Sequence, residues 1–410
     1  MVGTGVFTSL GFQLLEFTSP TLILTLWVIG GVLALCGALC YAELGAALPR
    51  SGGEYNFLTR LYHPGAGFVS GWISATIGFA APTALAAITF GSYLNAVIPA
   101  VSPSWAAAVL VLVTGLAHAT NRRTSGTFQL VFTIAKVLLI LAFTVAALGL
   151  ARAPQTRVWA ISEEDVRLTA TAGFAIALIY VNYAYTGWNA ATYLAGELDD
   201  AQSTLPKVLT FGTLLVLVLY VLLNFTFLAV APVSAMAGKV EVGHIAATHA
   251  FGERAGDVMG LMLAVLLVST VSAMVLAGPR VLQVIGEDFS ALRALAATNS
   301  GGVPVRAIAV QCALSVLMIF TAAFDAILLF TGFTLALNTL AAVCGVFVLR
   351  RRGIPLRFRM PLYPLPPLVF IAITLWTMIY LAGERPMEVL WGLVIVLAGA
   401  AFYLGTGKGY

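Results

Sequence analysis

The sequence contains very little charge. Only 9% of its 410 residues are Asp, Glu, Lys or Arg, whereas a soluble domain carries about 25%. In addition, 60% of the residues are hydrophobic and the mean hydropathy is +0.98. No soluble fold of this length could bury that much apolar surface, so the composition excludes a soluble protein and indicates a polytopic membrane protein. Its apolar segments are about 20 residues long and uninterrupted, which predicts transmembrane helices rather than barrel strands.

Other absences exclude further classes. No basic start or cleavage site accompanies the first apolar stretch, so we expect no cleavable signal peptide. The net charge of +4 is small and follows from the loops, so it indicates no nucleic-acid partner. All four cysteines lie in apolar stretches. Cys36 and Cys40 have a spacing that metal ligands on one helix face could have, but we interpret them as packing residues. The sequence therefore implies no metal site and no cofactor.

Histidine is also scarce where catalysis would need it. The four histidines all lie at span ends or in loops: His63, His118, His244 and His249. The only pairing that resembles a catalytic one is Lys136 with a serine of a later span. We therefore expect no catalytic residue, and a transporter rather than a membrane enzyme or a sensor.

Apolar segments divide the chain into eleven full spans and one short span. We expect them at residues 5–17 (the short one), 21–48, 65–98, 103–119, 125–150, 170–196, 207–231, 255–284, 304–323, 326–349, 361–383 and 387–406. Several exceed the length that a bilayer requires, so we expect tilted or extended helices.

Basic residues predict the orientation of these spans. One set of alternate loops holds Arg50, Arg60, Arg122, Arg123, Lys207, Arg280, Arg293, Arg306, Arg350, Arg351, Arg352, Arg357, Arg359 and Lys408. The other set holds only Arg152, Arg157, Arg167, Lys239, Arg254 and Arg385. The richer set is predicted to be cytoplasmic.

Lys136 is the basic residue that this division leaves inside the membrane. It lies in the middle of the fifth span, in FQLVFTIAKVLLILAF. A charge at that depth costs at least about 2.5–3.5 kcal/mol, which makes the residue a functional candidate by default. A lysine that snorkels to the interface, or that only ties helices together, is the alternative.

Two glycine-containing breaks interrupt apolar spans. Gly3-Thr4-Gly5 opens the first span, and Thr186-Gly187-Trp188-Asn189 lies within the sixth. Paired breaks in two inverted halves indicate the substrate site of a transporter. A helix that starts at Gly5 offers N–H groups and a positive dipole end to a carboxylate, and the ends of the preceding half-helices offer carbonyls to an ammonium. A site that suits both charges predicts an amino acid as substrate.

These motifs resemble the amino acid–polyamine–cation superfamily, close to its L-type and cationic amino acid permeases. GTGVF, FTIAKVLL and YTGWN resemble its motifs in helices 1, 5 and 6, and ELDDAQSTLPK resembles the loop after helix 6. YAELGAALPRSGGEYNFL (41–58) and AGPRVLQVIGED (277–288) resemble the cytoplasmic ends of helices 2 and 8. The resemblance implies an all-α LeuT-like five-plus-five inverted repeat with two further helices. Its parts would be residues 1–150 (helices 1b–5), 170–350 (helices 6–10) and 361–406.

The resemblance also implies roles for the residues at the breaks. Gly3, Thr4 and Gly5, with the N–H of Val6, should meet the substrate carboxylate. Carbonyls around Tyr183, Ala184, Thr186 and the adjacent Gly187 should receive its ammonium. Tyr183 stands at the position of an aromatic gate, although ordinary packing is the alternative for this ring.

Lys136 would occupy the place of a sodium ion in sodium-coupled relatives. Its ammonium should lie between helices 1 and 8, with Ser269, Thr270 and Ser272 as candidate partners. This argues against sodium coupling. Proton symport and obligatory exchange both remain open.

Glu43 and Glu54 are candidates for the cytoplasmic gate, with helix capping as a nearly equal alternative. Apart from Glu43, no Asp or Glu lies deep in a full span, so we favour neutral amino acids. Cationic amino acids or polyamines on the same fold are the alternative; a nucleobase or an inorganic ion is a further one. We expect a multi-pass protein of the cytoplasmic membrane. Animal L-type relatives pair with a glycoprotein, but no docking cysteine is evident here, so we expect no obligatory protein partner.

The resemblance also bears on the start of the chain. Family members have an intracellular tail and a half-helix before the Gly-x-Gly motif, and both are absent here. We expect the native start to lie roughly 20–40 residues upstream. In the alternative, a truncated chain would lack part of the inner gate and transport poorly.

Overall fold

The computed structural model describes residues 2–120, 125–150 and 161–406, and every regular element in these ranges is a helix. This confirms the predicted all-α fold. The long or span-forming elements are α1 (Gly5–Glu16), α2 (Pro20–Ala47), α4 (Pro64–Ile73), α5 (Ala80–Val97), α6 (Pro103–Thr120), α7 (Ser125–Leu150), α9 (Ala172–Tyr185), α10 (Ala201–Val230), α13 (Glu253–Asp288), α15 (Val305–Thr321), α16 (Phe324–Arg351), α17 (Leu365–Glu384) and α18 (Pro386–Gly405).

Shorter elements connect these helices. They are α3 (Glu54–Leu61), η1 (Ser74–Gly78), α8 (Glu163–Leu168), η2 (Ala190–Glu197), α11 (Val233–Met236), α12 (Val242–Phe251), η3 (Ser290–Leu292) and α14 (Arg293–Ala296). In the described ranges, nine helical segments are long and apolar enough to cross a membrane. The remaining predicted spans are the shorter helices α1, α9 and α15.

Two predicted spans are not continuous α-helices. The third is interrupted by η1, a π-helical turn that joins α4 to α5. The sixth stops at Tyr185 and resumes as the 3₁₀ segment η2, so the predicted break at 186–189 is confirmed as a break in the helix. Gly187 lies in this break with a φ of 91°, a conformation that glycine adopts without strain.

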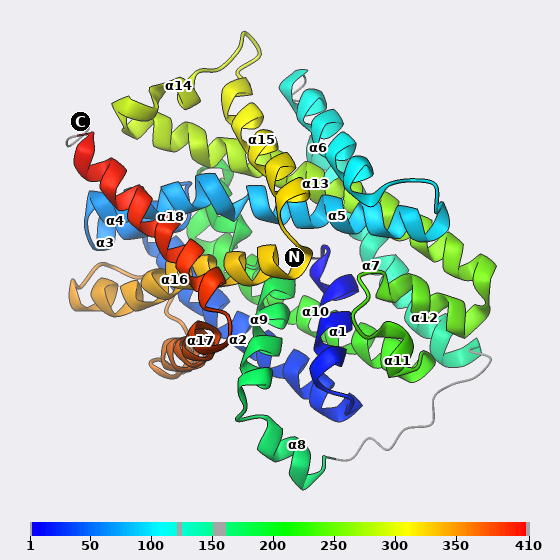
Figure 1. Cartoon of the computed structure of the whole chain (residues 1–410). Coiled ribbons are helices and arrows are strands. Elements are labelled where there is room, and N and C mark those ends of the chain that lie inside the picture. Colours follow the sequence, from blue (N-terminus) through cyan, green and yellow to red (C-terminus); the bar gives the residue numbers. More distant parts are fainter. Residues whose placement is uncertain (1, 121–124, 151–160, 407–410) are drawn as a thin grey trace.

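The broken helices lie at the centre of the molecule. In Figure 1, α1 and α9 run side by side near the middle, and α5 and α13 cross next to them. α17 and α18 lie at one side, where α18 packs on α4 and α16. The end of α9 and the start of α1 are therefore enclosed by other helices.

Small residues let the central helices approach closely, as expected in a membrane, where packing drives association. A Cβ on Gly5 of α1 would overlap with the Cα atom of Ala184 in α9. A Cβ on Gly30 of α2 would overlap with the side chain of Val181 in α9. The two glycines thus fix α9 between α1 and α2.

Some expectations fall outside the described residues. They concern Met1 and the basic residues Arg122, Arg123, Arg152, Arg157 and Lys408. The orientation of the chain and its division into repeats at 1–150, 170–350 and 361–406 stay predictions.

Candidate functional site

The end of α9 and the start of α1 meet at a cavity, which we call the central cavity. Its volume is about 150 Å³, far more than the 10–15 Å³ or so that one water molecule needs. It is lined by Val2, Gly3, Thr4, Gly5, Pro82, Gln129, Thr133, Lys136, Tyr183, Ala184, Thr186, Ser269, Thr270, Ala273 and Met274. Segments far apart in the sequence therefore form one site.

Of the residues predicted for substrate binding and coupling, all but three line this cavity. Val6 is fully buried beside it, and Gly187 shapes the turn behind Thr186. Ser272 of α13 lies outside the cavity, where its Oγ is 2.8 Å from Nε2 of His118 in α6. The expectation that Ser272 contacts Lys136 is therefore corrected, because its hydroxyl faces α6 and not α7.

Lys136 reaches from α7 to α13 across the cavity wall. It is 7% exposed, and its Nζ donates a hydrogen bond of 2.8 Å to Oγ1 of Thr270. In the described residues Lys136 has no ion pair. The Oγ of Ser269, the third candidate partner, instead donates to the Leu266 carbonyl of its own helix. The site thus contains a buried cation whose partner, among the residues that the structure describes, is a neutral hydroxyl.

The first residues of α1 and the last of α9 present opposite backbone groups. Thr4 occupies the N-cap position of α1, and its carbonyl accepts from the N–H of Phe7 at 2.9 Å. By helix geometry, the N–H groups of Gly5 and Val6 have no acceptor within α1, and the carbonyls in the last turn of α9 have no donor within α9. The two helix ends therefore offer donors and acceptors to the same space.

The backbone carbonyl of Tyr183, which was predicted to receive the substrate ammonium, already accepts hydrogen bonds within the protein. Its carbonyl accepts from both the N–H of Thr186 at 3.0 Å and the Thr186 hydroxyl at 2.6 Å. These two bonds occupy the lone pairs of that oxygen. Ala184 and Thr186 remain as the carbonyl candidates for an ammonium. The Tyr183 ring is 5% exposed and its side chain meets that of Thr4, so it joins α9 to α1.

Sequence reasoning missed several residues of the cavity wall. Gln129 and Thr133 precede Lys136 by seven and three positions on α7, which places all three on one helical face. That spacing could have identified them. The Gln129 amide also donates to the Ser269 carbonyl at 3.2 Å and so ties α7 to α13. Pro82 and Met274 carried no comparable signal.

A second cavity of about 90 Å³ lies between α2, α9, α16 and α17. Asn182, Trp188 and Thr339 contribute to its wall, together with many apolar side chains. Tyr183 and Thr186 line both cavities. The last turn of α9 therefore separates two hollow regions, which no sequence motif indicated.

Glu43, the first candidate of the cytoplasmic gate, is held in an ion pair. Its carboxylate is fully buried in α2 and accepts two hydrogen bonds of 2.7 Å from the Arg350 guanidinium of α16. It also accepts from the N–H of Met360 at 2.7 Å. Glu43 thus joins α2, α16 and the segment that follows α16.

Glu54, the second candidate, is the first residue of α3 and is 2% exposed. It accepts hydrogen bonds from the Tyr41 hydroxyl at 2.9 Å and from the Asn189 amide at 2.6 Å. Asn189 belongs to the break in the sixth span. Glu54 therefore connects the helix 2 motif directly to that break.

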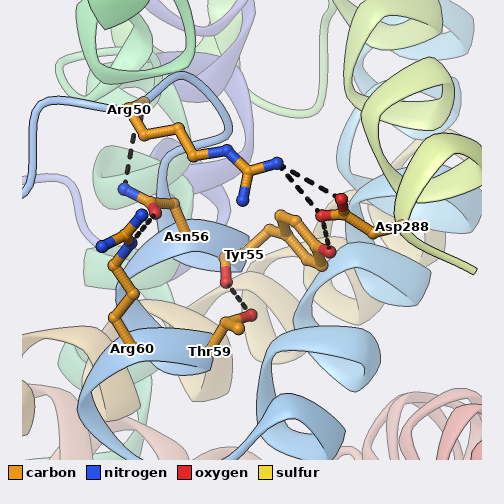
Figure 2. A network of polar contacts seen from close by, with 6 residues as sticks. All are labelled: Arg50, Tyr55, Asn56, Thr59, Arg60 and Asp288. Carbon is orange, nitrogen blue, oxygen red and sulfur yellow. Dashed lines mark hydrogen bonds and ion pairs between the residues drawn. The ribbon is translucent and has the colours of Figure 1, made fainter. Parts of the chain in front are cut away.

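Figure 2 shows how the residues around Glu54 are anchored on their other side. Arg50 forms an ion pair of 3.2 Å with Asp288, the last residue of α13, and the Tyr55 hydroxyl donates to the same carboxylate. The Asn56 amide donates to the Arg50 carbonyl and accepts from Arg60. α3 is thus tied to the end of α13 as well as to the break.

Several known proteins match this chain along nearly its whole length. A family model described as amino acid permease matches residues 1–402. The serine/threonine exchanger SteT of Bacillus subtilis is 27% identical over 421 aligned residues, which cover 100% of this chain and 94% of that protein. The large neutral amino acids transporter small subunit 2 of Homo sapiens is 27% identical, with 98% of this chain and 77% of that protein covered. The b(0,+)-type amino acid transporter 1 of Mus musculus is 26% identical, with 98% and 84% covered.

Proposed function

The chain belongs to the amino acid permease family, and we propose that it carries neutral amino acids across the membrane through the central cavity. The observation that supports this most is the meeting of two helix ends in one cavity with Lys136. The start of α1 suits a carboxylate, and the last carbonyls of α9 suit an ammonium. The substrate's charged groups would bind there, and alternating access would expose the cavity to each side in turn.

Neutral substrates are favoured by the composition of the cavity wall. Among the described residues that line it, none is Asp or Glu, and Lys136 is a cation. A cationic side chain would meet no opposite charge there and would be repelled by Lys136. The names of two relatives, a serine/threonine exchanger and a large neutral amino acids transporter, agree with this choice.

Lys136 supports sodium-independent transport. Its ammonium is fixed by Thr270 between α7 and α13, so a positive charge is already present beside the start of α1. A second cation in the same place would cost additional electrostatic energy. We therefore propose that replacing sodium by choline leaves transport unchanged.

We also propose that the chain needs no obligatory protein partner. The name of one relative contains the words small subunit, which describes that protein as one part of an assembly. For this chain, the mass of the purified protein–detergent complex tests the point. Activity of the purified chain alone supports independence, and activity only after a second protein is added contradicts it.

Uptake into proteoliposomes tests the function itself. Purified protein would be assayed with radiolabelled L-serine, L-threonine, L-leucine, L-arginine and putrescine, with unlabelled amino acid inside to permit exchange. We expect saturable uptake of one or more neutral amino acids and little uptake of arginine or putrescine. A clear preference for arginine or putrescine would overturn the neutral assignment, and no uptake of any amino acid would overturn the proposed function.

A further inference from the structure

Residues 352–364 join the end of α16 to the start of α17, and we call them the α16–α17 linker. Their sequence, RGIPLRFRMPLYP, contains three arginines and neither Asp nor Glu, and Arg350 and Arg351 precede it directly. The two flanking helices are both long and apolar enough to cross a membrane. The linker therefore lies where the chain turns back between two spans, at the surface of the membrane.

Side chains of the linker alternate between an inward and an outward side. The inward ones pack on the hydrophobic core formed with α2, α3 and α16, and they are Ile354, Leu356, Phe358 and Met360. Arg357 and Arg359, which stand between them in the sequence, are exposed, as are Arg351 and Arg352. The apolar side chains thus hold the linker on the protein, while the arginines form an outward basic row.

The linker is also fixed by polar contacts. The N–H of Met360 donates to the Glu43 carboxylate at 2.7 Å, which is the carboxylate that pairs with Arg350. The guanidinium carbon of Arg350 lies 3.7 Å from the centre of the Tyr363 ring. Because the backbone of the linker is already held in place, a partner that binds to its outward row has little conformational freedom left to remove.

Leu362 adds an apolar side chain to this basic surface. It is 75% exposed and its φ is 58°, in the left-handed region that leucine rarely adopts. Leu365 and Leu368, at the start of α17, are also exposed. The protein gives the Leu362 side chain little apolar contact, whereas the apolar layer of a bilayer would receive it.

Positive charge predominates around the linker. Arg357 and Lys207 of α10 both act electrostatically on Asp200, the N-cap residue of α10, so the basic row continues toward that helix. Asp199 and Asp200 are exposed there. The exposed basic residues outnumber these two carboxylates, and they are Arg351, Arg352, Arg357, Arg359 and Lys207. Clusters of about four to eight Lys or Arg next to a membrane span attract anionic lipids.

We propose that the α16–α17 linker is a binding site for anionic phospholipid. The outward guanidinium groups bind phosphate oxygens of the lipid headgroup, and Leu362 enters the apolar layer beneath it. A zwitterionic headgroup carries its own cation and binds less tightly. Since Glu43 and Arg350 connect the linker to α2 and α16, lipid bound here also stabilises the ends of these helices. This site does not depend on which substrate the chain carries.

Lipid binding to the purified full chain tests the proposal. The protein in detergent would be titrated with dioleoylphosphatidylglycerol or with dioleoylphosphatidylcholine, and bound lipid would be counted by native mass spectrometry. One variant combines Arg357→Gln with Arg359→Gln. The matched control combines Arg167→Gln with Arg254→Gln, which also removes two exposed arginines, in α8 and at the start of α13. A further titration adds excess inorganic phosphate as competitor.

We expect wild type and the control to bind phosphatidylglycerol at least about tenfold more tightly than phosphatidylcholine, because each basic residue near a membrane surface contributes about fivefold. The linker variant should lose about tenfold or more in affinity for phosphatidylglycerol. Equal affinity of wild type for the two lipids would overturn the proposal, and so would equal losses in the linker variant and the control. Displacement of phosphatidylglycerol by inorganic phosphate would show that a free anion suffices, and would overturn it too.

Leu362→Asn tests the apolar part of the site without disturbing the fold. Asparagine adopts the left-handed conformation more readily than leucine, so the unfolding temperature without added lipid should not fall. Loss of the inserted side chain should weaken phosphatidylglycerol binding by about tenfold. Wild-type affinity in this variant would overturn the role of Leu362.

Discussion

Buried charge is paired differently in the central cavity and at the C-terminal ends of α2 and α16. In the cavity, Lys136 has one neutral hydroxyl as its partner. At the helix ends, Glu43 has a two-bond ion pair with Arg350 and a third bond from a backbone N–H. Loss of one partner from a fully paired buried charge destabilises the fold, whereas a buried charge with few partners is available to a ligand. The contrast separates residues that act on substrate from residues that hold helices together.

The largest expected effect is on transport, from Lys136→Ala. Removing the cation should reduce exchange of labelled neutral amino acids to background, because the substrate carboxylate and α13 lose their fixed positive charge. Stability should change little, because the lysine forms no ion pair in the described residues and its burial is costly. Uptake assays and thermal unfolding in detergent measure the two properties. A Lys136→Ala protein that transports normally would contradict this role.

Glu43→Gln should have the reverse outcome, a clear loss of stability with little loss of transport. It leaves the Arg350 guanidinium, about a quarter exposed, without its carboxylate partner. Breaking a buried ion pair costs about 3–5 kcal/mol, and we expect the lower end because Arg350 reaches solvent. Thermal unfolding measures the loss. The control is Glu388→Gln, which removes the more exposed pair with Arg385 and should cost less than about 1 kcal/mol. Equal losses in the two variants would contradict the contrast.

Gly5→Ala tests the close approach that shapes the central cavity. The added methyl group would overlap with the backbone of Ala184, so α1 and α9 must separate. Overpacking of this kind costs about 1–3 kcal/mol, and we expect exchange to fall by about tenfold or more. Gly212→Ala is the matched control, since a Cβ on Gly212 would meet nothing within 4 Å. Exchange that is reduced equally in both variants would contradict the importance of this contact.

The sequence predicted the outline of the molecule well, for physical reasons. Spans are long runs without charge, and a membrane leaves little choice about how such runs fold. The structure confirms the all-α fold, and the family match confirms the predicted family and the transporter class. The break in the sixth span was also predicted, because Thr186-Gly187 interrupts an apolar helix.

Contacts across the fold could not be predicted in the same way. Ser269, Thr270 and Ser272 are close in sequence, yet only Thr270 accepts a hydrogen bond from Lys136, because the rotation of α13 decides which hydroxyl faces α7. Likewise Glu43 and Glu54 are similar in sequence context. Their partners come from α16 and from the segment after α9, which no local pattern encodes. Whether the central residues bind substrate stays a prediction.

The smallest expected effect lies outside both regions, at the start of α8. Ser162 and Asp165 form a capping box, in which the N–H of Ser162 donates to the Asp165 carboxylate at 3.0 Å. This bond lowers the pKa of Asp165 below its usual value. A lowered pKa in the folded state means that the stabilisation is present at neutral pH and is lost as pH falls through that pKa, below about 4.

Asp165→Asn should remove this acid dependence and cost about 1 kcal/mol or less at neutral pH. Hydrogen exchange of the α8 amides, corrected for intrinsic rates, measures it. If hydrogen exchange of the α8 amides responded to acid equally in wild type and in Asp165→Asn, the ionisation of Asp165 would not stabilise this cap. Ionisation would then matter only in the two regions of buried charge.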